Sequence, residues 1–544
     1  MSGSAGFPGA RAAWGRWCRC AESRRAGLVA GLVLGAAAVA YFVLCLYLAR
    51  NVTFTVDELL YFAEDGGFAP RELAEPFGGH LTATTRAIYA GGLELFGPEH
   101  LPFQVVTLLT IVAVAVLLFL LIRRWVGPLA ALGPALIVLF LGSTPTSIQG
   151  NATMWAHSTA FGLAAMLAFD RGGRRGDALA CAMLVLAVLS LEVGIAFALG
   201  IALWALARRQ PRRLWVAAVP LAIYAAWWLW ALKFDEGVTT ASNVLLIPAY
   251  TAEWLAAAAA AVSGLAVEFG EVSIESVESP WGPVALVALA GLGVLGIRRR
   301  GRVDAALWAA LGATVALGIA GAMAYGPLRT PDAARYLFPP AVLLLVMVAA
   351  CWRGQRPGPG ALAAMLGLTA LVLPANIWLL RERGNELRSL SDRTVATLAV
   401  LEAQGEAVVP AGLIVGLRVP FQSRLYFDGV ERHGSPIAGR DPIPELPASA
   451  REAADETLGM VLVPRLSPLL GDPKLSCIAP VEGGPVRLGA DPSRVAIRSV
   501  EGGAVLLARY GDRPTIPAGT LPPGVAARIA VAADGPWTAA LDGG

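Results

Sequence analysis

Long apolar runs recur along the first two thirds of the chain, and short arginine-rich or proline-rich segments separate them. A helix needs about 20 predominantly apolar residues to cross about 30 Å of hydrocarbon. Runs of this length, or a little shorter, predict an α-helical polytopic membrane protein with about eleven transmembrane helices. The runs cover residues 27–48, 102–122, 128–142, 155–169, 177–191, 193–207, 213–232, 281–297, 304–325, 336–352 and 360–380.

Arginine clusters follow every second run and predict the orientation of the helices. Examples are Arg123–Arg124, Arg208–Arg209 and Arg298–Arg300. Arginine-rich loops stay on the cytoplasmic side of a membrane. All clusters share that side only if residues 177–207 form two short helices with a turn near Glu192, rather than one long helix. We therefore expect the N-terminus in the cytoplasm and the C-terminus outside.

Hydropathy divides the chain into three parts, of which the first two concern the membrane. Residues 1–25 form a short cytoplasmic tail, and residues 26–380 form the transmembrane domain. Two outer loops interrupt this domain, at residues 50–101 and 233–280. The second loop contains an amphipathic stretch near residues 250–266, which we expect to lie in the membrane interface.

Residues 381–544 predict a small extracytoplasmic α/β domain, because hydropathy falls and proline and glycine turns separate short apolar runs. We expect a helix at about residues 383–404, followed by strands such as residues 459–463 and 504–508. No repeat of fixed period is apparent along the sequence.

The composition excludes several classes of protein. The chain has 544 residues, of which 56% are hydrophobic and only 15% are charged. A soluble domain carries about 25% charged residues, so a soluble globular enzyme is excluded. The formal net charge of +3 excludes a nucleic-acid binder that acts through bulk charge. Lysine occurs only at Lys233 and Lys474, and together with 60 glycines and 37 prolines this indicates a high-GC, actinobacterial-like genome.

Acidic residues of the first outer loop are candidates for catalysis. Asp57 and Glu58 closely follow the first helix, so we expect their carboxylates at the membrane surface. A carboxylate in a site that excludes water can have a raised pKa and act as a general base. His80 and Arg86 follow in the same loop. A solvated acidic loop is the alternative, because such loops are common on an outer face.

A short outer loop before the tenth run carries Arg329, Arg335 and Tyr336. The planar guanidinium matches phosphate oxygens, so these residues are candidates for binding a lipid phosphate. The alternative is an arginine–tyrosine anchor at the interface. Glu192 is a further candidate, because a charge at membrane depth is costly and is expected to face a cavity or a partner. If its turn reaches the outer surface, Glu192 is instead a solvated turn residue.

Common cofactor and metal motifs do not occur. The sequence has no glycine-rich phosphate loop, no HExxH zinc pattern and only 4 histidines. We therefore predict no metal and no cofactor. The spacing of Asp57 and Glu64 leaves a divalent cation open, although carboxylate spacing alone indicates it only weakly.

The order of these motifs resembles that of the GT-C-type glycosyltransferases, which are polytopic enzymes that use lipid-phosphate-linked sugars. The resemblance covers roughly residues 25–380, and a soluble outer domain at the C-terminus also fits it. It is carried by Val56-Asp57-Glu58-Leu59, by Gly79-His80-Leu81 with Arg86, by Leu101-Pro102-Phe103-Gln104 and by Arg335-Tyr336-Leu337-Phe338-Pro339.

The resemblance implies sugar transfer from a polyprenyl-phosphate donor to an envelope glycan, lipid or protein, on the outer face of a bacterial plasma membrane. Asp57 best matches the family's catalytic base, and Glu58 is the near alternative. One base and one displacement imply inversion at the anomeric carbon. The pair is Asp-Glu where some relatives have Asp-Asp, which leaves the roles of the two carboxylates open. The implied substrate-binding residues are His80, Arg86, Glu192, Arg329, Arg335 and Tyr336.

Two other classes stay open. A transporter or flippase of lipid-linked glycan precursors would place ionisable groups near the bilayer midplane, where only Glu192 is a candidate. A non-catalytic membrane scaffold would use the outer domain to bind an envelope partner. A single outward cavity that gathers Asp57, Glu192 and Arg335 would favour the enzyme over both.

Overall fold

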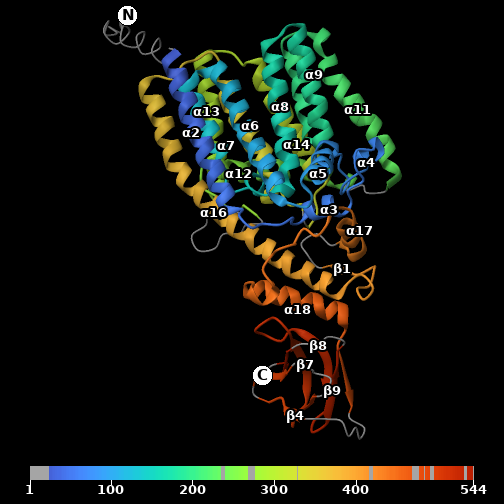
Figure 1. The fold of residues 1–544 in the computed structure, drawn as a ribbon. Helices are drawn as coiled ribbons and strands as arrows, with labels where there is room; N and C mark the ends of the chain where they lie inside the picture. Colours follow the sequence, from blue (N-terminus) through green and yellow to red (C-terminus); the bar gives the residue numbers. More distant parts are fainter. Residues whose placement is uncertain are drawn as a thin grey trace, which may run out of the picture. The chain divides into compact units, whose positions relative to one another are not determined.

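Figure 1 shows the computed structural model of the chain, which forms two compact units. The first unit comprises Met1–Arg50, Gly66–Gly91 and Leu101–Asn385, and the second comprises Asn51–Asp65, Gly92–His100 and Glu386–Gly544. Most of the predicted cytoplasmic tail, residues 1–23, lies outside the part of the chain that the structure describes. The described residues are 24–234, 239–266, 276–277, 279–327, 329–415, 421–468, 477–482, 484–489, 495–531 and 536–542.

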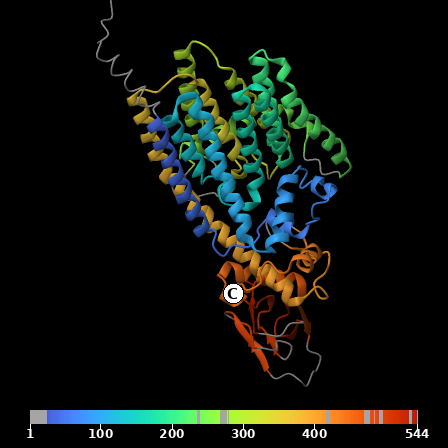
Figure 2. The same cartoon turned by 45° about the horizontal axis from the view of Figure 1, so that its top comes forward.

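The first unit is a bundle of helices that lie side by side (Figures 1 and 2). Each predicted apolar run coincides with one of them, and within the described residues seven helical segments are long and apolar enough to cross a membrane. The prediction of an α-helical polytopic membrane protein is confirmed. The main helices are α2 (Arg24–Leu48), α6 (His100–Val126), α7 (Pro128–Leu139), α8 (Thr153–Arg171), α9 (Gly173–Ser190), α10 (Val193–Ala207), α11 (Trp215–Ala231), α12 (Ile247–Val262), α13 (Gly282–Arg300), α14 (Ala305–Met323), α15 (Phe338–Cys351) and α16 (Pro359–Gln404).

The outer faces of these helices are apolar, as expected of surfaces that meet lipid. On α2, Leu28 and Leu32 are 59% and 73% exposed, whereas Tyr41 and Cys45 are buried against the bundle. A helix that is hydrophobic all round would not be stable at a water-exposed surface, but it suits the interior of a bilayer.

Salt bridges join the arginine clusters at one end of the bundle, which we call the arginine end. Asp170, near the C-terminus of α8, pairs with Arg208 at the end of α10 and with Arg353 after α15, at 3.1 and 2.7 Å. Arg124 on α6 approaches the same carboxylate at 3.6 Å. Helices α8 and α10 can end together only if the chain turns between α9 and α10. The predicted turn near Glu192 is therefore confirmed.

Together with the preceding 3-10 helix Ala241–Leu246, helix α12 has the length and composition of a membrane span, but its contacts place it across one end of the bundle. A Cβ atom at Gly282, which begins α13, would lie 2.8 Å from the Ala256 carbonyl oxygen. A Cβ atom at Gly321, near the end of α14, would lie 2.8 Å from the Tyr250 ring. Short connections make α13 and α14 antiparallel, so these two termini share one end. The interfacial position of this segment stays a prediction from the sequence.

The second unit combines helices with two four-stranded sheets. Helix α3 (Asp57–Ala63) packs on α17 (Ser423–His433), where Arg432 donates a hydrogen bond of 2.7 Å to the Ala63 carbonyl oxygen. The other elements are α18 (Ala448–Leu462), β1 (Ile414–Val415), β2 (Phe421–Gln422), β3 (Arg465–Pro468), β4 (Cys477–Pro480), β5 (Val486–Gly489), β6 (Val495–Arg498), β7 (Gly503–Ala508), β8 (Ile516–Leu521), β9 (Ala526–Ala530) and β10 (Trp537–Leu541). The strands of the two sheets are ordered β5-β10-β7-β8 and β3-β9-β6-β4, and neighbouring strands are antiparallel except β4 and β6.

Three sequence expectations differ from these elements. Residues 383–404 are not a separate helix, because α16 continues without a break from the last apolar run for 46 residues. Residues 459–462 end α18 and are not a strand, since a short apolar run fits the buried face of a helix equally well. The first outer loop, residues 50–101, is divided between the two units. The strand at residues 504–508 is confirmed as part of β7.

Candidate active site

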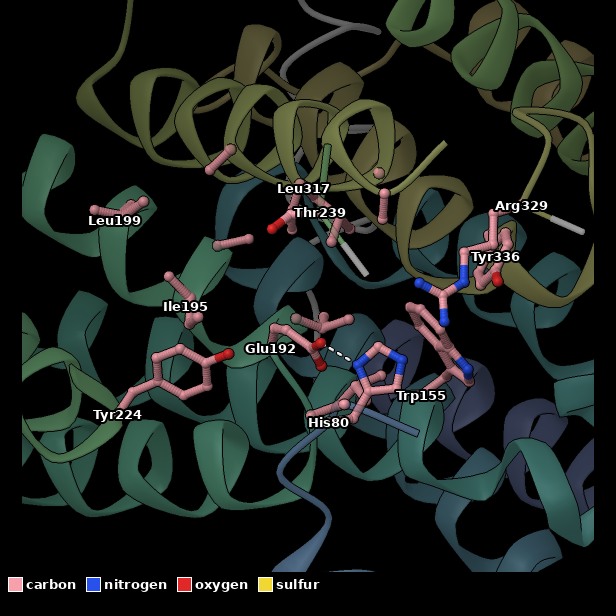
Figure 3. A pocket seen from close by; sticks show the side chains of 18 of the residues that line it. His80, Trp155, Glu192, Ile195, Leu199, Tyr224, Thr239, Leu317, Arg329 and Tyr336 are labelled. Atoms are coloured by element: carbon pink, nitrogen blue, oxygen red, sulfur yellow. Dashed lines mark hydrogen bonds and ion pairs between the residues drawn. The ribbon is translucent and has the colours of Figure 1, made fainter. Parts of the chain in front are cut away.

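The first unit contains a cavity of about 310 Å³, enclosed by residues of α8, α10, α11, α12, α14 and the segments that join them. Figure 3 shows Arg329 at one side of it, the apolar Leu199 and Ile195 at the other side, and His80 and Glu192 between them. Its acidic and basic lining residues are His80, Glu192 and Arg329, and all three were candidates in the sequence. Since the turn between α9 and α10 contributes Glu192, the cavity lies at the end of the bundle opposite the arginine end, which we call the cavity end.

A tight turn presents His80 to the cavity. Phe77 and His80 exchange backbone hydrogen bonds of 2.9 and 3.1 Å across Gly78 and Gly79. Both glycines have left-handed backbone angles, with φ of 57° and 84°, as a two-residue type I′ turn requires. The Phe-Gly-Gly-His sequence therefore fixes the position of His80. The Nδ1 atom of its imidazole ring forms a hydrogen bond with the Glu192 carboxylate.

Glu192 directly precedes the first residue of α10. One oxygen of its carboxylate has a hydrogen-bond partner among the described residues, and the other does not. Its Oε1 atom meets His80, whereas its Oε2 atom is buried and has no hydrogen-bond partner among the described residues. Burial favours the neutral form of this carboxyl group, but the nearby charges of His80 and Arg329 outweigh burial and hold the pKa of Glu192 below its ordinary value. Glu192 thus lines the cavity as a carboxylate with one buried oxygen that lacks a hydrogen-bond donor among the described residues.

Aromatic side chains wall the cavity near Arg329. The rings of Trp155 and Tyr336 pack edge to face with centroids 5.3 Å apart. Trp254 on α12 donates a hydrogen bond of 3.3 Å to the Tyr336 carbonyl oxygen, which ties the loop before α15 to α12. Figure 3 shows the Arg329 guanidinium on the same side of the cavity as Trp155 and Tyr336. Arg329 therefore lines the cavity together with these aromatic side chains.

Two arginines from the sequence prediction lie elsewhere in this unit. Among the described residues that line the cavity, neither Arg335 nor Arg86 occurs. The exposed Arg335 guanidinium lies over the Tyr336 ring, 5.0 Å from its centroid. The Arg86 guanidinium lies 5.6 Å from the centroid of the Phe77 ring, next to the turn that carries His80. Their positions suit a supporting role for the loops that carry Tyr336 and His80.

The two acidic candidates, Asp57 and Glu58, belong to the second unit and have different surroundings. Glu58 is fully buried and accepts hydrogen bonds of 3.3 Å from the Thr55 amide and hydroxyl groups. Its other oxygen lies 3.1 Å from the His100 Nε2 atom. Glu58 is therefore part of the internal packing of this unit. Asp57 begins α3 and is half-buried.

Asp57 follows a residue with an unusual backbone conformation. Val56 has φ 51° and ψ −123°, a region that β-branched residues rarely adopt. Such strain concentrates at functional sites when the surrounding structure holds it in place. The role of Asp57 as a base stays a prediction from the sequence.

Within the described ranges, no group of three or more histidine, cysteine, aspartate or glutamate side chains is arranged to hold a metal ion.

Sequence reasoning missed most of the aromatic lining. Tyr224 and Trp228 on α11, and Tyr250 and Trp254 on α12, were not candidates, although each pair has the four-residue spacing of one helix face. The signal was ambiguous because tyrosine and tryptophan also gather at membrane interfaces as anchors. Trp155 also lines the cavity, from the first turn of α8.

Comparisons with known proteins identify no family for this chain. No family model matches the sequence, and no curated protein is similar to it. Among solved structures, the chain is similar to the crystal structure of ArnT from Cupriavidus metallidurans bound to undecaprenyl phosphate. The two share 13% sequence identity and a TM-score of 0.45, over 86% of this chain and 92% of that chain. A likeness of this size assigns neither an activity nor a ligand to this protein.

Proposed function

We propose that this protein is a GT-C-type membrane glycosyltransferase, which transfers a sugar from a polyprenyl-phosphate donor to an envelope glycan, lipid or protein. The cavity of the first unit is the single observation that carries this proposal. It combines the cationic Arg329 with an apolar side where Leu199 and Trp228 are 39% and 51% exposed on the helix surfaces. A cation beside a surface-reaching apolar wall suits a phosphate with a lipid chain.

Arg329 is the residue that we propose for holding the donor phosphate. Its planar guanidinium can bind two phosphate oxygens at once, and the aromatic walls around it exclude water and strengthen that attraction. The same charge offsets the negative charge that develops on the departing lipid phosphate. The sequence made both Arg329 and Arg335 candidates for this role, and the lining of the cavity favours Arg329.

In the proposed reaction, Asp57 accepts the proton of the acceptor hydroxyl group. The resulting oxygen attacks the anomeric carbon, the bond from that carbon to the phosphate oxygen breaks, and polyprenyl phosphate leaves with the bonding electrons. The leaving phosphate is a weak base, so no general acid is needed. One displacement of this kind inverts the anomeric carbon. The internal hydrogen bonds of Glu58 disfavour it as the base.

We propose that the cavity end faces the outside of a bacterial plasma membrane and that the N-terminus lies in the cytoplasm. The salt bridges of Asp170 gather arginine clusters at the arginine end, and positively charged ends stay in the cytoplasm. The cavity end then faces outward, where envelope acceptors are available.

The test is sugar transfer by the purified full-length protein in vesicles. We expect release of polyprenyl phosphate from a panel of short-chain polyprenyl phosphates that carry mannose, glucose, arabinose or an amino sugar, in the presence of an envelope extract as acceptor. Asp57→Asn is expected to abolish release and leave membrane insertion unchanged. Movement of intact donor across the vesicle without bond cleavage indicates a flippase instead, and neither activity indicates a scaffold.

A further inference from the structure

The side chains of Glu192 and Tyr224 carry oxygen atoms and line the cavity away from Arg329, which we propose to bind the donor phosphate. Figure 3 shows the Tyr224 hydroxyl group pointing toward the Glu192 carboxylate, whereas Arg329 lies at the other side of the cavity. Both residues line the cavity. An acceptor and a hydroxyl group that face the same space can bind two neighbouring hydroxyl groups of one ligand.

The charges around Glu192 favour a neutral ligand group over an amine. His80 contacts one oxygen of the carboxylate, and Arg329 acts on it electrostatically. An ammonium group would add a further cation to this small space, whereas a hydroxyl group donates a hydrogen bond without charge. The second oxygen, Oε2, is buried and has no hydrogen-bond partner among the described residues. A buried acceptor without a donor is unfavourable, and a ligand hydroxyl group relieves that cost.

The size and walls of the cavity fit one sugar ring. Its volume of about 310 Å³ lies at the lower end of the range of about 300–1,000 Å³ for small-molecule sites. Trp155, Trp228 and Trp254 provide flat apolar surfaces on which the C–H faces of a ring can pack. The cavity therefore has room and suitable walls for one sugar ring.

We infer that Glu192 and Tyr224 bind hydroxyl groups of the transferred sugar, so that the protein selects donors with a neutral, fully hydroxylated monosaccharide. The inference rests on the proposed function, because it concerns the sugar of the lipid-linked donor. A site that hydrogen-bonds a hydroxyl group discriminates strongly against an analogue without it, since the buried polar groups then lose their partner.

The experiment compares donors that differ by one hydroxyl group. For the sugar that the full-length protein transfers best, we measure kcat/KM for the intact donor, for its monodeoxy analogues and for its amino-sugar analogue. We expect the wild type to prefer the intact donor over at least one deoxy analogue by about 100-fold or more. Glu192→Ala and Tyr224→Phe are expected to reduce that ratio to about tenfold or less, because the mutant site no longer distinguishes the two donors.

Matched control variants remove the same groups outside the cavity. Glu253→Ala removes an exposed carboxylate from α12, and Tyr325→Phe removes a hydroxyl group after α14; neither residue lines the cavity, and both variants are expected to keep the wild-type ratio. If Glu192→Ala does not fold, Glu192→Gln keeps the shape of the side chain without its charge. Tyr224→Phe alone removes one hydroxyl group and should leave the fold intact.

The outcomes separate the inference from the proposed function. Transfer with an unchanged ratio in the Glu192 and Tyr224 variants overturns the inference and leaves the proposed function in place. A wild-type preference for the amino-sugar donor also overturns it. A folded protein that cleaves no donor of the panel rejects the proposed function, and the inference is rejected with it.

Discussion

The two ends of the first unit both gather charged side chains, but the carboxylates Asp170 and Glu192 at these ends differ in how their oxygens are paired. At the arginine end, Asp170 is 2% exposed and accepts hydrogen bonds from Arg208, Arg353 and Trp125. At the cavity end, the Glu192 side chain is 25% exposed, and its Oε2 atom has no partner within the described part of the chain. Complete pairing indicates a structural role, whereas an unsatisfied group beside open space indicates a ligand.

The largest expected effect is on stability, at the arginine end. Asp170→Ala removes the carboxylate that pairs with Arg124, Arg208 and Arg353. Removing one partner of a buried ion pair lowers the free energy of unfolding by about 3–5 kcal/mol. Denaturant unfolding of the purified protein in detergent measures this loss. The donor preference of the remaining folded protein should stay as in the wild type. A loss similar to that of the exposed Glu253→Ala variant would show that the network contributes little.

The second prediction concerns binding at the cavity end and compares two arginines of one loop. Arg329→Ala removes charge-assisted hydrogen bonds to the donor phosphate, so KM for the donor should rise about 10- to 100-fold. Arg335→Ala is the matched control, because Arg335 is exposed, lies over the Tyr336 ring and is not a lining residue. Its effect on KM should be much smaller. A larger rise in KM for Arg335→Ala than for Arg329→Ala would assign the phosphate site to Arg335 instead.

The third prediction distinguishes the structural role of Glu58 from the catalytic role that we propose for Asp57, its neighbour in α3. Glu58→Gln disturbs the hydrogen bonds to Thr55 and His100, and an unsatisfied buried group costs about 1–3 kcal/mol of unfolding free energy. Asp57→Asn should change the unfolding free energy far less, although it abolishes transfer. Unfolding and activity measured on both variants test this division. Equal stability losses would show that Asp57 is also a structural residue.

The sequence allowed the membrane fold to be predicted because a bilayer fixes the length and the apolar character of each helix. The arginine clusters also placed the turn between α9 and α10, since charge asymmetry acts on whole loops. The continuation of α16 past residue 380 was missed because charged residues lower hydropathy without breaking a helix. The run at residues 459–463 was misassigned because five apolar residues do not reveal their periodicity.

The site was harder to predict, because its partners are far apart in the sequence. His80 and Glu192 were both candidates, but 112 positions separate them, and no local pattern pairs them. Arg329 and Arg335 lie in one short loop, and composition alone does not say which of them faces a cavity. Tyr224 was missed because it lies in the middle of α11, and a single tyrosine in an apolar run does not show whether it faces lipid, the protein core or a cavity.

The smallest expected effect is a pH dependence that distinguishes Glu192 from an ordinary surface carboxylate. The pKa of its carboxyl group is lowered in the folded protein, because the charges of His80 and Arg329 outweigh burial. An acid with a lowered folded-state pKa stabilises the protein above its unfolded pKa of about 4.3, and this stabilisation disappears as pH falls through the folded-state pKa. The melting temperatures of the wild type and Glu192→Gln should therefore differ by a constant amount between about pH 5 and 6 and converge below about pH 4. Arg329 keeps its charge throughout this range, so the convergence reports on the carboxylate. A difference that grows as pH falls would mean that burial dominates and that Glu192 binds its proton more tightly in the folded protein.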